Sequence, residues 1–278
     1  MQVFIIEHLK TTWRLIVETY NKYDQDSCAT LAAALAFHSF FSIFPLLLFL
    51  IYIGSQVLQT EGVRELLSSG LIQFLPTGGD SISEVISATL DLRGSIGLVG
   101  GVGLVWSASS VFAVLEIALN RIWKSRRRPY WRTRLVATTS ILILSLVFLA
   151  SVTLGQFLPR LLALIQLPGL QWLGSLASIF ILVLVLSIFY SAFPSRRVSR
   201  KAAFGGAFAA GLSILAARFV FDMFINSAFA NYGSVYGSLA WIVSLALWTF
   251  VVATLFLFGA EFGSILEADM TARRKAAG

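Results

Sequence analysis

The chain has 278 residues, of which 57% are apolar and 13% are charged, and its mean hydropathy is +0.82. A soluble domain carries about 25% charged and 45–50% apolar residues. These figures exclude an ordinary water-soluble enzyme, and they exclude a disordered chain because disorder requires low hydrophobicity. The net charge is +7. We therefore predict an all-α, polytopic membrane protein.

Residues 1–29 have apolar side chains at helical spacing and charged side chains between them. The pattern predicts a cytoplasmic amphipathic helix rather than a cleavable signal peptide, because charges interrupt it too early for a signal. Two placements fit this helix: it lies in the membrane interface, or it packs on the ends of the membrane helices. Its apolar face is formed by Ile5, Leu9, Trp13, Ile16, Val17 and Tyr20.

Six further stretches are long and apolar enough to cross a bilayer, which takes about 20 helical residues. They cover residues 30–58, 95–118, 135–157, 172–193, 202–224 and 238–260. Pro45 lies inside the first and should kink it, because proline removes a backbone hydrogen bond. Residues 59–94 predict an amphipathic excursion on the outer side. The membrane domain then covers 30–263, and a cytoplasmic tail covers 264–278.

Lysine and arginine are unevenly distributed, with 17 of the 21 in residues 10–22, 121–134, 196–201 and 273–275. With six spans, all four segments face one side, which the positive-inside rule assigns to the cytoplasm together with both termini. We expect these segments to contact anionic lipid headgroups. Residues 126–131 mix basic and aromatic side chains as nucleic-acid patches do. Topology accounts for this without nucleic acid, because every inner segment is basic.

Polar side chains within spans are costly in lipid and usually face a partner or a cavity. The sequence offers seven candidates: His38, Ser42, Glu116, Asn120, Arg218, Asp222 and Glu261. Arg218 and Asp222 share a helix face, so they form either a neutralised pair at the outer interface or part of a polar pathway. His38 is either a core histidine or part of that pathway, and Glu116 either anchors a helix end or lines it. A hydrogen bond between Asn120 and Glu261, both at the inner face, is a further hypothesis.

Small residues indicate where helices pack closely in lipid. They recur at 94–103, at 202–211, and at Gly259 and Gly263. The single cysteine, Cys28, allows no intrachain disulfide and is expected to be a small apolar filler. Among enzyme signatures, the chain has two histidines and no zinc-protease, CxxC, P-loop or nucleophile-elbow motif. We therefore predict no catalytic residue, metal site or cofactor.

Three stretches of the sequence resemble the YihY/virulence factor BrkB family of bacterial inner-membrane proteins. The first is residues 33–46, and the second is 106–112 together with 118–123. The third is 236–240 together with Trp248 and residues 259–261. The motif positions are Pro45, Trp106, Trp123, Tyr236, Gly237, Trp248 and Gly259. The resemblance implies six spans in the inner membrane and inward termini. It also implies envelope-related roles, and it supplies no catalytic residue. The ribonuclease label once given to the family is regarded as a misassignment.

The leading functional hypothesis is transport or export of a substrate across the membrane, based on the intramembrane polar groups and the glycine-rich helices. The alternative is a non-transporting envelope factor that binds lipid or partner proteins, a second copy of the chain among them. A ribonuclease is the least favoured function, because the inner segments carry almost only basic residues and lack the hard ligands that a metallonuclease needs.

Overall fold

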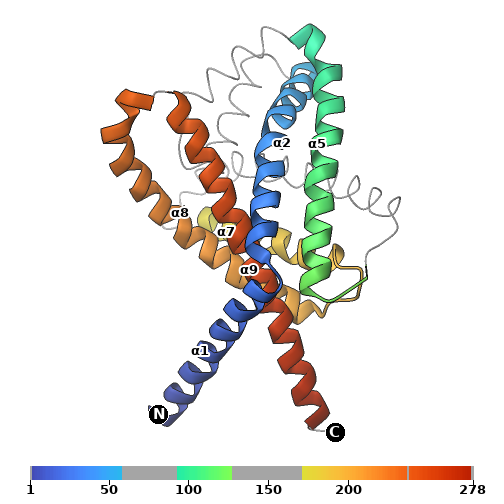
Figure 1. Cartoon of the computed structure of the whole chain (residues 1–278), viewed down its shortest axis with the longest axis vertical. Coiled ribbons are helices and arrows are strands. Elements are labelled where there is room, and N and C mark those ends of the chain that lie inside the picture. Colours follow the sequence, from blue (N-terminus) through green and yellow to red (C-terminus); the bar gives the residue numbers. More distant parts are fainter. Residues whose placement is uncertain (1, 58–92, 127–170, 237, 277–278) are drawn as a thin grey trace.

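A computed structural model describes residues 2–57, 93–126, 171–236 and 238–276, with helices as the regular elements (Figure 1). Six helices lie in these ranges: α1 (Gln2–Gln25), α2 (Cys28–Val57), α5 (Arg93–Ile122), α7 (Gln171–Ala192), α8 (Arg200–Tyr236) and α9 (Ser238–Ala276). The described ranges contain no strand, which confirms the all-α prediction for them.

Five of these helices lie where spans were predicted, but α8 and α9 are longer than expected. α8 continues to Tyr236 instead of ending near residue 224. α9 continues to Ala276 instead of ending near residue 260. The reason is local: residues 261–276 contain neither glycine beyond Gly263 nor proline, so nothing in the backbone ends the helix. The predicted span 135–157, the excursion 59–94 and Gly237 lie outside the described residues, apart from the start of α5.

Two helical segments are long and apolar enough to cross a membrane within the described ranges, Arg200–Ile225 and Ile242–Ala276. A third candidate is the bent pair Arg14–Gln25 and Cys28–Ile43, whose two parts meet at 71°. The structure is therefore that of a helical protein with two to three candidate membrane spans. The six-span count stays a prediction.

The bend between α1 and α2 lies at Ser27, whose φ of 53° is left-handed. The amide of Asp26 still donates to the carbonyl of Lys22 at 2.9 Å, so α1 keeps its last turn before the chain changes direction. α1 then packs against α9 and α2 through a face that includes the buried Thr19 and Tyr23. Its apolar Ile16, Val17 and Tyr20 stay exposed. Packing on the bundle thus uses another face of α1, and insertion of the apolar face in the interface stays a prediction.

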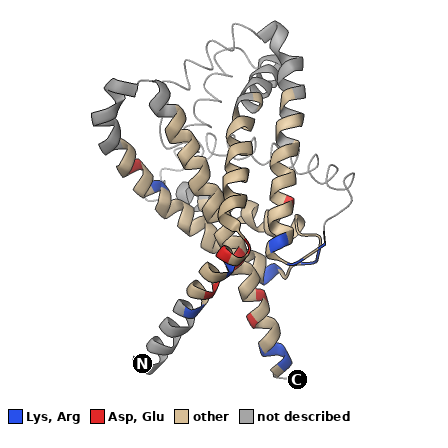
Figure 2. Cartoon of the chain, in the orientation of Figure 1, with Lys and Arg blue, Asp and Glu red and all other residues tan. Residues whose placement is uncertain are grey.

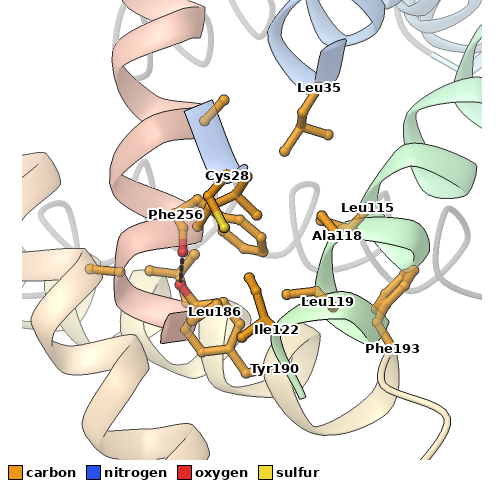
Figure 3. Close-up of a cluster of buried hydrophobic side chains, with 14 of the residues drawn as sticks. Cys28, Leu35, Leu115, Ala118, Leu119, Ile122, Leu186, Tyr190, Phe193 and Phe256 are labelled. Atoms are coloured by element: carbon orange, nitrogen blue, oxygen red, sulfur yellow. Dashed lines mark hydrogen bonds between the residues drawn. The ribbon is translucent and has the colours of Figure 1, made fainter. Parts of the chain in front are cut away.

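The main core lies where α2, α5, α7, α8 and α9 converge, near the end of the bundle that carries both termini (Figure 1). Figure 3 shows side chains from these helices meeting there, among them Leu119 and Ile122 of α5 and Phe256 of α9. Next to them, the rings of Phe112 and Phe193 stack at 5.5 Å between centroids. The core holds the helix ends near the termini at fixed positions, and the polar contacts below depend on that.

Close packing of α8 on α9 is made by glycine. A Cβ on Gly206 would lie 2.6 Å from the carbonyl oxygen of Gly259, and one on Gly263 would lie 3.0 Å from that of Ala202. Only residues without a side chain let the two backbones approach this far. This confirms the small-residue interface predicted for these two helices.

Charged side chains are concentrated at the end of the bundle where the termini lie (Figure 2). This end carries the basic residues that follow α5 and those at the end of α9. A few charged positions on α5 and α8 lie further along the bundle. The distribution agrees with the expected one-sided topology, and assignment of that side to the cytoplasm stays a prediction.

Candidate functional site

The most deeply buried charge among the described residues is the carboxylate of Glu261 on α9, which has no solvent exposure. It forms an ion pair with the ammonium of Lys22 on α1, with 2.9 Å between Nζ and Oε2. The side chain of Lys22 keeps 22% exposure. A buried carboxylate without a counter-ion would be very costly, so the pairing is required for Glu261 to remain charged.

The two remaining N–H groups of Lys22 are also used. One donates to the backbone carbonyl of Ile122 at 3.0 Å, and one donates to Oγ of Ser264. An ammonium has three donors, so all three are engaged. Ile122 is the last residue of α5, and its carbonyl has no partner within that helix. Lys22 therefore connects α1, α5 and α9 at one point.

Two more groups complete this cluster, which we call the Lys22–Glu261 junction. The thiol of Cys28, the first residue of α2, donates to Oε1 of Glu261 at 3.5 Å. The hydroxyl of Ser264 donates to the backbone carbonyl of Glu261 at 2.8 Å. Groups from α1 and α2 thus contact the carboxylate of Glu261 on α9, and α5 joins the cluster through the carbonyl of Ile122, which binds Lys22. The bend at Ser27 is what brings Lys22 and Cys28, on either side of it, to the same carboxylate.

Asp26 lies beside the junction, within interaction range of Glu261 and Cys28. Its Oδ2 is buried and has no hydrogen-bond partner. In this part of the described chain, Lys22 is the single cation that forms an ion pair beside the two neighbouring carboxyl groups, those of Glu261 and Asp26. The carboxyl groups of Asp26 and Glu261 are themselves within hydrogen-bond range of each other.

A cavity of about 330 Å³ opens next to the junction at the same end of the bundle. Most of its wall is the last two turns of α1, and Lys124 and Ile265 complete it. Lys22 and Asp26 reach both the cavity and the junction. A polar pocket thus adjoins the buried ion pair.

Asn120 forms a second buried polar contact, separate from the junction. Its Oδ1 accepts from the backbone N–H of Ser195 at 2.7 Å and from the hydroxyl of Ser125 at 2.6 Å. Its Nδ2 has no hydrogen-bond partner. The predicted hydrogen bond from Asn120 to Glu261 is therefore wrong. The amide is used instead to fix the chain after α7 against the end of α5.

Other contacts tie α7 and α8 to α9. The hydroxyl of Tyr190, a fully buried residue, donates to the backbone carbonyl of Phe256 at 2.6 Å, drawn as a dashed line in Figure 3. Glu267 accepts from the backbone N–H of Ser199 at 2.9 Å, just before α8 begins, and pairs with Arg196. A carboxylate at this position caps the helix and interacts favourably with its N-terminus.

The remaining polar candidates do not converge on the junction. Glu116 is 5% exposed, and its Oε1 has no hydrogen-bond partner. Ser42 donates to the backbone carbonyl of His38 at 2.7 Å, and both side chains are half-buried. Arg218 and Asp222 lie one turn apart on α8. Their roles in a pathway stay predictions.

The motif positions divide into packing residues and one exposed residue. Pro45 is helical and packs near Gly103 of α5, and Gly259 makes the close approach to α8. Trp123 and Trp248 are buried, whereas Trp106 is 76% exposed. The side chain of Tyr236, like Gly237, lies outside the described part of the chain. The motif positions with described side chains thus mainly serve helix packing.

Sequence reasoning missed Lys22, Ser264 and Tyr190, and it took Cys28 for an apolar filler. Cys28 is indeed buried, but its thiol is a donor to Glu261. One feature of the sequence could have drawn attention to Lys22. It is a charged residue at the end of the amphipathic segment, close to the start of the first predicted span. Within the described ranges, no group of three His, Cys, Asp or Glu side chains is arranged to hold a metal ion.

Comparison with known proteins places this architecture in a family. The chain is 26% identical to a UPF0761 membrane protein of Pseudomonas aeruginosa over 261 residues, which cover 92% of this chain and 63% of that protein. It is 26% identical over 272 residues to a UPF0761 membrane protein of Psychromonas ingrahamii, covering 95% and 91% of the two chains. A third relative, from Alteromonas mediterranea, is 27% identical over 243 residues, covering 86% and 82%.

The chain thus spans less than two thirds of the length of the Pseudomonas relatives and most of the other two. No solved structure matches it. The sequence profile described as Virulence factor BrkB matches residues 19–278, a range that holds every residue of the Lys22–Glu261 junction. The expected resemblance is confirmed: this chain belongs to the virulence factor BrkB family of membrane proteins.

Proposed function

We propose that this protein moves a substrate across its membrane, and that the Lys22–Glu261 junction closes the inner end of the route. The observation that carries the proposal is a fully buried carboxylate held by a lysine from another helix. Ionisable groups within a membrane helix bundle typically mark a substrate or ion pathway. A buried ion pair also stabilises a fold no better than apolar packing of the same volume, which favours a functional use of this one.

The junction has the construction of an element with two states. α1 joins α2 at Ser27, a single left-handed residue at a 71° bend. All three donors of Lys22 bind groups at the junction. Protonation of Glu261, or arrival of another cation, would release Lys22 and let α1 turn about the bend. Transport by alternating access requires such a discrete change in packing.

Cys28 offers a direct test, because it is the single cysteine of the chain and its thiol contacts Glu261. A membrane-impermeant maleimide is applied to right-side-out spheroplasts and to inverted vesicles. We expect Cys28 to react from both sides, and Lys22→Met to accelerate labelling from the inner side. Cys28→Ala gives the background, and Arg274→Cys in that background, exposed at the end of α9, reports on inner-side access. Reaction from one side under every condition, an imposed proton gradient included, would contradict alternating access.

A second function is supported by the exposed apolar face of α1, which consists of Ile16, Val17 and Tyr20. A non-transporting membrane protein that binds lipid or partner proteins would use such a face. In that case the junction is a static connection, and Cys28 reacts from one side only. The labelling experiment therefore separates the two functions.

A further inference from the structure

The contact between the carboxyl groups of Asp26 and Glu261 has no hydrogen-bond donor when both groups are ionised. The two groups lie within hydrogen-bond range of each other, yet an ionised carboxylate offers acceptors alone. Glu261 already accepts from Lys22 and from the thiol of Cys28. Oδ2 of Asp26 is buried and has no hydrogen-bond partner within the described ranges. A favourable contact between the two acids therefore needs a proton on one of them.

The charges around the two acids also favour one proton. Lys22 is the cation that contacts them, so one positive charge faces two carboxyl groups. Ionisation of both acids would leave one negative charge without a partner beside a fully buried carboxylate, which is costly, whereas a single proton makes the cluster neutral. The other titratable groups that the described chain places near this point are Tyr23 of α1, Cys28 of α2, Arg121 of α5, which donates to Ser27, and Glu18 and Lys124 on the cavity wall.

We propose that Asp26 and Glu261 form a proton-binding site that holds one proton, and that its transfer from Asp26 to Glu261 releases Lys22 from Glu261. In the structure the proton belongs on Asp26, because Glu261 must be ionised to pair with Lys22. The protonated Asp26 then donates to Glu261. The use of this proton to open the junction rests on the proposed function, whereas its presence requires only the contact between the two acids.

The transfer leaves no charge without a partner. An O–H bond of Asp26 breaks and an O–H bond of Glu261 forms, so Asp26 becomes a carboxylate and the buried Glu261 becomes neutral. Lys22 precedes Asp26 by one turn of α1, and the amide of Asp26 donates to the carbonyl of Lys22 at 2.9 Å. Opposite charges at this spacing on a helix attract each other. Lys22 thus exchanges a partner on α9 for one on its own helix, and α1 is freed from α9 at constant total charge.

The pH determines how much of the protein can open in this way, because two acids that share a proton titrate as a pair. Raising the pH removes the shared proton. Glu261 then stays ionised in its buried position and keeps Lys22 as its counter-ion, so alkaline conditions favour the closed junction. Asp26 is half-buried and lines the cavity, which gives the proton a route to water.

Infrared difference spectroscopy of the full chain in nanodiscs tests the proton. The wild type at neutral pH should show the C=O stretch of a protonated carboxyl group that shifts in heavy water. This band should be lost in both Asp26→Asn and Glu261→Gln, because Lys22 pairs with the single acid that remains. Asp24→Asn is the matched control, since Asp24 is exposed in the last turn of α1. Glu116→Gln identifies any band from Glu116, which is also buried.

The exchange of partners is tested by the distance between spin labels on α1 and α9. The labels are attached in Tyr20→Cys and Arg274→Cys, two exposed positions. The background is Cys28→Ser, which keeps a donor to Glu261. We expect two distances in this protein, with the population at the distance of the structure increasing as the pH rises.

The two acid variants should change these populations in opposite directions. Asp26→Asn should show the distance of the structure at every pH, because its amide donates to Glu261 but transfers no proton. Glu261→Gln should show the other distance at every pH, because no charge on α9 holds Lys22. A solely structural role of the two acids would not produce opposite effects.

Three results would overturn the proposal: no protonated-carboxyl band in the wild type, a band that persists in Asp26→Asn or Glu261→Gln, or equal distances in these two variants. The wild-type band and its pH titration depend on no variant, so they test the site even where a variant fails to fold. Labelling of Cys28 from one side only would instead contradict transport, and the band would still identify the proton site.

Discussion

Removing the ammonium of Lys22 should destabilise the protein strongly, because Glu261 would remain buried without a counter-ion. At 2.9 Å between Nζ and Oε2, the attraction of the two charges is about 6 kcal/mol with an effective dielectric constant of about 20. Desolvation of both groups offsets much of this, so the pair contributes little net stability. Breaking the pair on one side, however, costs about 3–5 kcal/mol. We expect a loss of this size for Lys22→Met.

The opposite substitution should cost less. Glu261→Gln leaves a lysine that is 22% exposed and lies at the cavity, where water can solvate it. We expect a loss of about 1–3 kcal/mol, and the double variant Lys22→Met with Glu261→Gln should be more stable than Lys22→Met alone. The assay is unfolding by SDS in mixed micelles, followed by tryptophan fluorescence, for all four members of the cycle.

The coupling energy between the two positions must exceed the cost of Glu261→Gln alone, about 1–3 kcal/mol, since the double variant is expected to be more stable than Lys22→Met. Additive losses, or a Lys22→Met variant as stable as the wild type, would show that Glu261 is neutral or hydrated when Lys22 is absent. Either result refutes the description of the junction as a tightly buried ion pair.

Two further predictions concern helix packing. Gly206→Ala should destabilise the protein by about 1–3 kcal/mol, because the new Cβ would lie 2.6 Å from the carbonyl oxygen of Gly259. Gly103→Ala, whose Cβ would meet only ordinary contacts at 3.6 Å, should be neutral or stabilising by up to about 1 kcal/mol; the same unfolding assay compares the pair, and equal effects would contradict the packing. Tyr190→Phe should cost about 0.5–1.5 kcal/mol, since it removes one buried hydrogen bond while the carbonyl of Phe256 keeps its place in the backbone ladder of α9. A melting temperature unchanged in this variant would mean that the hydrogen bond contributes nothing.

The class of the protein and the positions of its described helices follow from local pattern. Long apolar stretches predicted helices where α2, α5, α7, α8 and α9 occur, because hydropathy over about 20 residues is a local property. Small residues at 202–211 and at Gly259 and Gly263 predicted that both helices have a close-packing face, and the structure shows that these two faces meet. The sequence did not predict that α9 continues to Ala276, because a polar continuation of a helix beyond its apolar span has no hydropathy signal.

The partners of the polar residues could not be found this way. Asn120 and Glu261 were both recognised as polar groups at the inner end, yet their expected bond is absent, and each has other partners. Which polar groups meet depends on the rotation of each helix about its own axis. It also depends on the position of each helix along that axis, to within about one turn. Sequence spacing does not determine these quantities between helices far apart in the chain.

The sequence by itself thus determined that this chain is a helical membrane protein with its described charges gathered at one end, since both properties are sums over neighbouring residues. Tertiary structure alone decided that Lys22 and Cys28 meet Glu261. That contact requires the left-handed turn at Ser27 and the close crossing of α8 on α9, which positions the C-terminal half of α9. A buried charge needs its counter-ion within a few ångströms, so it is the packing of distant helices that selects which lysine is paired.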